Sequence, residues 1–190
     1  MRKLIVQEYA SLDGFVADAK GGLAFTGPYA RGAEIDKDAG HLIDSIDTIV
    51  LGEVTYQLFV KIWPERTNSQ TIIADSFNST PKIVFSQKLA EAPWGKWPAA
   101  KVSKNRAEKE VAELKQQPGK DIIVWGSISL AQSLIKAGLV DEYQLLVCPV
   151  ALGEGRKLFT PDEVLSLKLL ETKPYASGLV LMRYAPAPAS

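Results

Sequence analysis

Short apolar runs alternate with amphipathic stretches over most of the chain. Apolar runs rich in β-branched residues predict buried strands, and apolar positions spaced by three or four predict helices packed on a sheet. By this pattern the strands cover residues 4–9, 48–51, 82–85, 100–102 and 122–125. The helices between them cover residues 34–45, 54–60, 104–117 and 127–137. Such an alternation is typical of an α/β domain with a mostly parallel central sheet.

The C-terminal part of the chain changes this rhythm. A strand over residues 141–150 ends at a glycine-rich loop, and residues 165–172 and 178–184 predict an antiparallel pair. Residues 64–79 are polar and rich in Asn and Ser, which predicts a long surface connection. Because no linker or internal repeat interrupts the pattern, we expect one domain over residues 1–185 and a frayed tail over residues 186–190.

Charge and hydropathy narrow the classes of partner. The 190 residues include 22 Lys or Arg and 22 Asp or Glu, so the formal net charge is zero. Without a basic excess, neither a nucleic acid nor a membrane surface is expected, which leaves a small molecule or a second copy of the chain. No apolar stretch approaches the ~20 residues of a membrane span. The N-terminus predicts a first strand and not a signal peptide.

The scarce cysteine and histidine limit the chemistry further. The single cysteine, Cys148, excludes an internal disulfide and fits a reducing, cytoplasmic location. Because it lies in an apolar run, we expect it to be a buried structural residue. The single histidine, His41, excludes a His-based metal cluster, so no metal site is expected.

Three turns at predicted strand ends have chemistry suited to a phosphate-rich cofactor. In an open α/β sheet, ligands bind beyond the carboxyl ends of the strands, where backbone N–H groups at helix starts are unpaired. The three turns contain Gly52 to Thr55, Ser86 to Lys88, and Gly126 to Ser129. Ordinary helix capping explains each turn alone, but three of them in one domain favour a dinucleotide. The G-x-G-x-x-G fingerprint and the P-loop are both absent.

Three ordered segments carry a family resemblance. They are Ser11-Leu12-Asp13-Gly14-Phe15, Gly52 to Tyr56 followed by Trp63-Pro64, and the stretch from Leu114 through Trp125-Gly126-Ser127 to Phe159. Together they resemble the stand-alone dihydrofolate reductase-like proteins related to the riboflavin-biosynthesis reductase domain, which is the C-terminal half of bifunctional deaminase-reductases. The resemblance runs from about residue 3 to residue 184. It implies a dihydrofolate reductase-like three-layer sandwich, NADPH as the hydride donor, and a homodimer.

The resemblance also implies which residues form the site. Under it, the cofactor contacts are Gly52, Glu53, Thr55, Ser86, Gln87, Lys88, Gly126, Ser127, Ile128 and Ser129. Residues 86–88 lie by the adenosine end, and residues 126–129 hold the pyrophosphate. The loop around Asp13 and Gly14 closes over the nicotinamide and the substrate. The family typically has Arg at positions 53 and 87, so the carboxylate of Glu53 leaves NADH as an alternative cofactor.

Reduction of a C=N bond also needs a proton, and two acids are candidates. Asp36 lies near the helix start where dihydrofolate reductases place their substrate-binding acid, and Asp13 lies in the first turn. Asp36 also fits an ordinary first-turn acid, and Asp13 fits a residue that caps its own loop, so both roles stay open. Tyr56, three residues before Phe59, is a candidate for stacking on a planar substrate.

The sequence therefore predicts an NADPH-dependent reductase similar to 5-amino-6-(5-phosphoribosylamino)uracil reductase. A dihydrofolate or pterin reductase is the nearest alternative. A non-catalytic nucleotide-binding or dimeric scaffold protein is the alternative of a different class, and Glu53 and the lack of an unambiguous proton donor favour it. Deamination is excluded because the chain has no Cys/His zinc motif.

Overall fold

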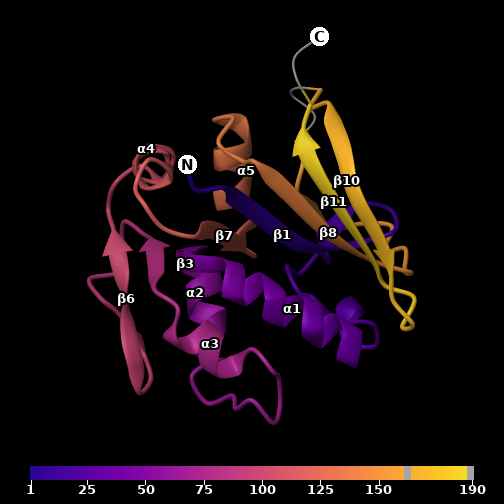
Figure 1. The fold of residues 1–190 in the computed structure, drawn as a ribbon, viewed down its shortest axis with the longest axis horizontal. Coiled ribbons are helices and arrows are strands. Elements are labelled where there is room, and N and C mark those ends of the chain that lie inside the picture. Colours follow the sequence, from indigo (N-terminus) through magenta and orange to yellow (C-terminus); the bar gives the residue numbers. More distant parts are fainter. Residues whose placement is uncertain (161–163, 188–190) are drawn as a thin grey trace.

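One large sheet runs through the molecule. The structure, a computed structural model, describes residues 1–160 and 164–187. Nine strands pair in the order β10-β11-β8-β1-β7-β3-β4-β6-β5 (Figure 1). Their bounds are β1 Leu4–Ser11, β3 Ile46–Gly52, β4 Lys82–Phe85, β5 Ala92–Trp94, β6 Trp97–Ser103, β7 Asp121–Trp125, β8 Glu142–Cys148, β10 Leu167–Pro174 and β11 Val180–Pro186. The strands from β8 to β6 are parallel to their neighbours, and β10, β11 and β5 are antiparallel. The mostly parallel sheet with antiparallel C-terminal strands is confirmed.

Helices cover both faces of this sheet. On one face lie α1 (Ala33–Ser45), α2 (Glu53–Phe59) and α3 (Ala74–Ser79), and on the other lie α4 (Ala107–Lys115) and α5 (Ile128–Lys136) (Figure 1). A short 3-10 helix, η1 (Ala24–Thr26), precedes α1. Because strand side chains alternate between faces, Val6 and Ala10 of β1 pack under α4 and α5, while Ile5 packs under the other helices. The three-layer architecture is therefore as expected. Within the described residues, none of the helices combines the length and apolarity needed to cross a bilayer.

A small second sheet lies at the end of β1. Strand β2 (Phe15–Ala17) pairs antiparallel with β9 (Arg156–Lys157). Gly155 makes this pairing possible, because a Cβ atom at this position would lie 2.3 Å from the carbonyl oxygen of Ala17. The glycine-rich loop expected after residue 150 thus brings the segment after β8 against the turn that follows β1.

The structure corrects the expected surface connection over residues 64–79. Its last part forms α3, in which the Phe77 side chain is fully buried and its ring centroid lies 4.0 Å from that of Trp63. The polar Asn78 is also buried, because its side chain donates to the carbonyl of Trp63 and accepts from the indole N–H of Trp94, both at 2.7 Å. Hydrogen bonding makes burial of these polar residues favourable, so a polar sequence does not mark an exposed segment here.

Two other expectations need correction at the sheet edge and the C-terminus. The strand expected over residues 100–102 is longer, and it forms a hairpin with β5 through a turn at Gly95, where φ is +57°. At the C-terminus, Pro186 belongs to β11, and the backbone N–H of Ala187 donates to Ser166 at 2.9 Å. These two residues of the expected tail are therefore ordered by the hairpin, and the remainder, residues 188–190, lies outside the described residues.

Candidate functional site

The three predicted turns meet at one open cleft. Because β3, β4 and β7 are parallel neighbours, their carboxyl ends lie along one edge of the sheet. A cleft of about 460 Å³ opens there, lined by Gly52, Glu53, Val54, Thr55, Phe85, Ser86, Gln87, Lys88, Ser127, Ser129 and Leu130. Most of the expected cofactor contacts are in this lining. Gly126 and Ile128 flank Ser127 in the turn, and sequence reasoning missed Val54, Phe85 and Leu130.

A hydrogen bond joins two of these turns. The backbone N–H of Gly52 donates to Oγ of Ser127 at 2.8 Å. Ser127 has φ +63°, and it is the one non-glycine residue with positive φ among the described residues. Gly126 before it also has φ +63°, and a Cβ there would lie 3.0 Å from Cγ2 of Thr55. A left-handed serine is unfavourable, and such backbone strain clusters at binding sites. Since Oγ of Ser127 accepts from Gly52, its own hydrogen is available to a ligand in the cleft.

The remaining turn, residues 86–88, supplies the cation of the cleft and binds the anion, Glu53. The Ser86 hydroxyl donates to Oε2 of Glu53 at 2.6 Å, and the backbone N–H groups of Lys88 and Leu89 donate to Ser86 Oγ at 3.1 and 3.0 Å. Gln87 is turned to the neighbouring loop, since its amide donates to the carbonyl of Lys104 at 2.9 Å. Among the described residues that line the cleft, Lys88 is the one cation and Glu53 the one anion. The cleft therefore carries one positive and one negative side chain.

Asp13 holds two loops together. Its carboxylate accepts from the hydroxyl of Ser11 at 2.6 Å and from the backbone N–H groups of Leu152 and Gly153, the latter at 2.7 Å. The hydrogen bond from Ser11, followed by those from the backbone, lowers the pKa of Asp13 to about 2. The carboxyl is therefore ionised at neutral pH, where it has no proton to donate. Gly14 follows with φ +87°, as the turn into β2 requires.

Asp36 lies in a different environment, near the end of β1 on the α1 face. It is in the first turn of α1, where its backbone N–H donates to the carbonyl of Gly32 at 2.9 Å. Burial, followed by the charges of Cys148 and Asp36, raises the pKa of Tyr9 to about 12. Cys148 is buried and free, and burial raises the pKa of its thiol to about 11, so it is a structural residue as expected. Asp36, Tyr9 and Cys148 are thus neighbours under the start of α1.

The structure corrects the expectation for Tyr56. This side chain is only 5% exposed, its hydroxyl donates to the carbonyl of Pro93 at 2.8 Å, and its ring lies 6.0 Å from that of Trp94. Phe59 also packs in the core, against Phe77. The helical spacing does place Tyr56 and Phe59 on one face, but that face is turned toward the sheet. A surface for stacking on a substrate is therefore not present at Tyr56.

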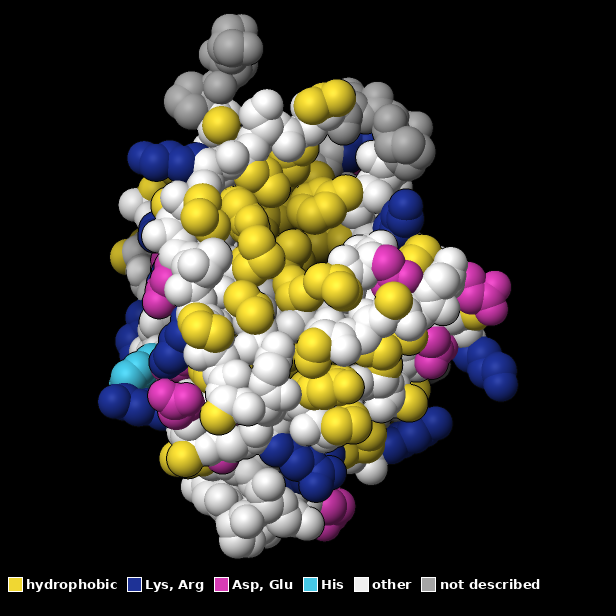
Figure 2. Space-filling model, turned by 90° about the vertical axis from the view of Figure 1, so that its right-hand side faces the viewer, with side chains coloured by type: hydrophobic (Ala, Val, Ile, Leu, Met, Phe, Trp, Pro, Cys, Tyr) yellow, Lys and Arg dark blue, Asp and Glu magenta, His cyan; other side chains and the backbone are white. Residues whose placement is uncertain are grey.

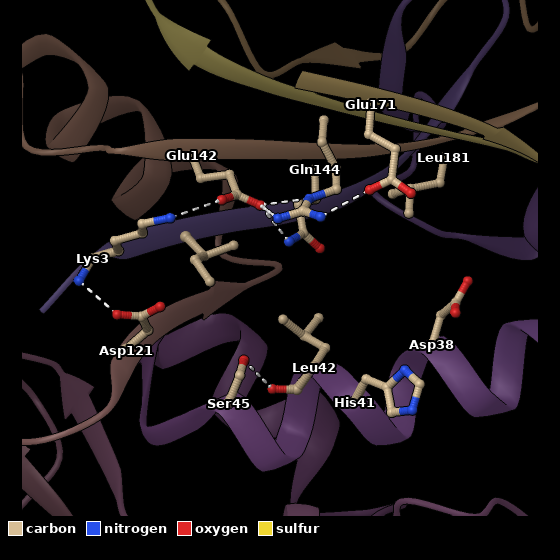
Figure 3. A pocket seen from close by; sticks show the side chains of 12 residues that line it. Lys3, Asp38, His41, Leu42, Ser45, Asp121, Glu142, Gln144, Glu171 and Leu181 are labelled. Carbon is tan, nitrogen blue, oxygen red and sulfur yellow. Dashed lines mark hydrogen bonds and ion pairs between the residues drawn. The ribbon is translucent and has the colours of Figure 1, made fainter. Parts of the chain in front are cut away.

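A second pocket, of about 400 Å³, lies between α1 and the sheet. Figure 3 shows Asp38, His41, Leu42 and Ser45 on the α1 side, and Lys3, Asp121, Glu142, Gln144, Glu171 and Leu181 on the strand side. Lys3 and Asp121 lie at the amino ends of β1 and β7, so this pocket opens at the edge of the sheet opposite the cleft. His41 is exposed at the rim of this pocket.

A row of hydrogen bonds under α1 connects this pocket with the strand that carries the Gly126 turn. The indole N–H of Trp125 donates to Gln7 at 2.6 Å, Gln7 donates to Gln144 at 2.9 Å, and Gln144 donates to Glu142 at 2.8 Å. Arg183 then binds Glu142 at 2.7 Å. Burial acts to raise the pKa of Glu142, but hydrogen bonds from Arg183 and Gln144 outweigh it and hold the pKa below its ordinary value. This row was not predicted from the sequence.

Glu8, on β1, was missed as well. It is 5% exposed, and its Oε1 is the one buried side-chain oxygen or nitrogen without a hydrogen-bond partner among the described residues. Burial raises the pKa of Glu8 to about 8. A signal was available, because a central strand of a parallel sheet is covered on both faces, so any acid in it becomes buried.

An apolar surface lies on the C-terminal hairpin. Leu169 and Leu170 of β10 are 51% and 47% exposed, and Leu165 before it is 39% exposed. Leu167 and Tyr184 of the same hairpin pack against the core. Figure 2, which faces this side of the molecule, shows hydrophobic side chains gathered in a hollow there. β10 is also the last strand of the sheet, paired on one side by β11.

Comparison with known proteins agrees with this architecture. The family model of the RibD C-terminal domain matches residues 2–181. The uncharacterized protein YyaP of Bacillus subtilis is 32% identical over 188 residues, which cover 96% of this chain and 94% of that protein. A putative riboflavin biosynthesis protein from Shewanella sp. PV-4 has a similar structure, with a TM-score of 0.78, 23% identity, and coverage of 97% and 99%. Dihydrofolate reductase from Enterococcus faecalis, complexed with NADP(H), gives a TM-score of 0.61 at 15% identity, with coverage of 97% and 96%. The fold is therefore dihydrofolate reductase-like.

Proposed function

The chain belongs to the RibD C-terminal domain family, and on this premise we propose that it is an NADPH-dependent reductase of a pyrimidine-type heterocycle. The reaction would resemble that of 5-amino-6-(5-phosphoribosylamino)uracil reductase. The cofactor supplies the hydride when bound, so the protein has to position it, hold the substrate and provide a proton. Each of these tasks can be assigned to described residues.

The observation that carries this proposal is the bond between Gly52 and Ser127. It joins the β3–α2 turn to the β7–α5 turn, so that backbone N–H groups and hydroxyls converge on one cleft. The donors suit the pyrophosphate of a dinucleotide. A Cβ at Gly126 would lie 3.0 Å from Cγ2 of Thr55, so glycine lets the β7–α5 turn approach α2 closely here.

For the proton we propose Asp36. Asp13 is ionised and fully used as a loop anchor, so its role is to hold the turn after β1 against Leu152 and Gly153. Asp36 lies on the α1 face beside Tyr9, where a substrate on this side of the sheet would meet it.

NADPH is the family's cofactor, and the cleft weakens that preference. Glu53 stands where the family has Arg, and Ser86 holds its carboxylate in the cleft at 2.6 Å. A carboxylate repels the 2′-phosphate of NADPH but accepts hydrogen bonds from a free ribose. Lys88 offers the compensating charge. We therefore include NADH as a second donor in this proposal.

The proposal extends to assembly and location. A homodimer would cover the exposed leucines of β10, which a monomer leaves in water. The reduced, buried thiol of Cys148 is compatible with the cytoplasm.

Binding of the cofactor is the first test. Trp125 directly precedes the Gly126 turn, so its fluorescence should change when NADPH or NADH enters the cleft. Loss of reduced nicotinamide absorbance would then be followed with a ribosylaminopyrimidine and, separately, with dihydrofolate. Absence of binding of either cofactor at about millimolar concentration, a weak affinity on the usual scale, would favour the scaffold protein instead.

A further inference from the structure

Glu8 lies on β1, the strand next to β7, near the edge of the sheet at which the cleft opens. In the register of β1 and β7, Gln7 is opposite Trp125, so Glu8 is beside the Gly126 turn. Its side chain is on the same face as Val6 and Ala10, two residues away on either side. On this face of β1, the small side chain of Ala10 is the only one between Glu8 and the carboxyl end of the strand. The neighbouring Gly126 adds no side chain either.

The surroundings of Glu8 leave its carboxyl without a partner. The hydrophobic cluster on this face is built from strands β1, β2, β3, β4, β7 and β8 and from helices α4 and α5, and Tyr143 is its one member with a polar side-chain atom. The buried charged groups of the covering helix α4 are paired elsewhere, Glu110 with Lys101 and Lys115 with Asp141. Neither these groups nor Lys136 of α5 and Arg156 and Lys157 of β9 contribute to the shift in the pKa of Glu8. Burial alone raises the pKa of Glu8 to about 8, so the group is largely a neutral acid at pH 7. A buried polar group without a partner is costly, and a ligand that supplies the missing hydrogen bond removes this cost.

The order of strands along the cleft indicates which ligand group reaches Glu8. Successive strands are about 4.8 Å apart. In the proposed function, the adenosine end lies by Glu53 and Ser86 at β3 and β4, and the pyrophosphate lies at the Gly126 turn of β7. The next strand in the same direction is β1. An extended dinucleotide therefore brings its nicotinamide half to the end of β1, where Glu8 is the polar side chain of the α5 face.

Resting on that cofactor placement, we propose that Glu8 binds the carboxamide of the nicotinamide ring. A protonated carboxyl has one O–H donor and one free carbonyl acceptor. A primary carboxamide offers the complementary pair, so the two groups form reciprocal hydrogen bonds. The pair would fix the rotation of the nicotinamide ring and would satisfy the oxygen that has no partner in the protein alone. Glu8 is thus a positioning residue for the hydride donor.

The test compares a whole dinucleotide with a fragment that lacks nicotinamide. Calorimetric titrations would use NADP⁺ and 2′-phospho-ADP-ribose, and NAD⁺ and ADP-ribose, with the wild type, Glu8→Leu and Glu8→Gln. Glu8→Leu should weaken the two dinucleotides about tenfold or more, as expected for the loss of one or two hydrogen bonds. Both fragments should bind within about twofold of the wild type. Glu8→Gln, which keeps a donor and an acceptor, should lose less affinity than Glu8→Leu.

The pH dependence separates recognition from a general effect on the cleft. Wild-type affinity for NADP⁺ should fall as the pH rises through about 8, because ionised Glu8 loses its donor. Affinity for the fragment should not follow this fall, and Glu8→Gln should abolish it for the dinucleotide. Glu110→Gln is the matched control, because Glu110 is a buried acid on a different element, α4. This variant should leave the affinity for both ligands unchanged.

The titrations distinguish failure of the role proposed for Glu8 from failure of the proposed function. If dinucleotide and fragment both bind but the Glu8 variants change them equally or not at all, the role of Glu8 is refuted and the cofactor cleft stands. If neither ligand binds the wild type, the proposed function itself fails. Thermal unfolding of Glu8→Leu should occur at or above the wild-type temperature, since the change removes an unpaired buried carboxyl. A variant that does not fold is replaced by Glu8→Gln, which has the same size.

Discussion

Ser86 and Glu53, 33 residues apart in sequence, are joined by a 2.6 Å hydrogen bond across the mouth of the cleft. The bond fixes one carboxylate oxygen of Glu53 and leaves the other for a ligand. A fixed carboxylate favours the hydroxyls of a free ribose over a 2′-phosphate, so this pair of residues should set the choice between NADH and NADPH.

Glu53→Arg should therefore tighten NADPH binding by roughly tenfold, the effect of one charge-assisted contact to the phosphate, while NADH changes much less. Fluorescence titration with both cofactors measures this. Glu113→Arg makes the same charge change on the exposed face of α4 and is the control. An equal shift for the two cofactors would mean that residue 53 does not face the 2′ position.

Ser127 should matter through its hydroxyl and through its backbone. Ser127→Ala removes the acceptor for Gly52 and keeps the left-handed backbone, whereas Ser127→Gly removes the acceptor and relieves the strain. Both variants should bind the dinucleotide more weakly, and the glycine variant should be about 1 kcal/mol more stable than the alanine variant in denaturant unfolding. Ser133→Ala, on the same helix but outside the cleft lining, should retain wild-type binding.

The two acids should respond differently to amidation. Asp36→Asn should lower turnover by about 10²-fold or more, the usual contribution of a general acid, with cofactor affinity nearly unchanged. Asp13→Asn should also lower turnover, because the Leu152–Gly153 loop loses its anionic acceptor. Steady-state kinetics across pH decides between roles. With a pKa of about 2, Asp13 stays ionised from pH 5 to 9, so its variant should keep the shape of the wild-type pH–rate profile. If turnover of Asp36→Asn is normal, the proton comes from water.

The row of hydrogen bonds under α1 should give a pH-dependent part of the stability. The folded-state pKa of Glu142 is lowered, so its contribution is present above the unfolded pKa of about 4.3 and is lost as the pH falls through the folded value. Glu142→Gln should cost roughly 2 kcal/mol at pH 7, less than a fully buried pair because Arg183 is still 35% exposed. Denaturant unfolding at pH 7 and pH 3 should show the difference from the wild type shrinking at the lower pH. A difference that is independent of pH would contradict the ionic role.

An element could be predicted from the sequence where its own residues determine its structure, and not where distant residues do. The strand over residues 82–85 has the predicted bounds, because its apolar run is complete in itself. The short helix α3 was not predictable from periodicity, since Phe77 is buried by Trp63 and by partners distant in sequence. The three-residue strand β5 contains Pro93, which argues against a strand unless it lies at an edge.

The cofactor turns were found because glycine and hydroxyl residues at strand ends carry a local signal. The burial of Tyr56 and of Glu8 depends instead on what packs against their elements, which periodicity alone does not specify. Glu8 is buried because β1 lies in the middle of the sheet, between β7 and β8, and helices cover this face. Polar residues in predicted central strands are therefore the positions to inspect first in such a fold.

The exposed leucines of β10 lead to the last prediction, a homodimer through the C-terminal hairpin. Leu169 and Leu170 are about half exposed on the outermost strand, and stable interfaces bury about 800 Å² on each partner around such an apolar centre. Light scattering at micromolar concentration should give twice the 20.7 kDa mass of the chain. Leu169→Lys should shift the species to the monomer, because a buried lysine without a partner opposes association. Ile72→Lys, at an equally exposed position in the loop before α3, should leave the mass unchanged. A wild type that runs as a 20.7 kDa species at this concentration refutes the dimer.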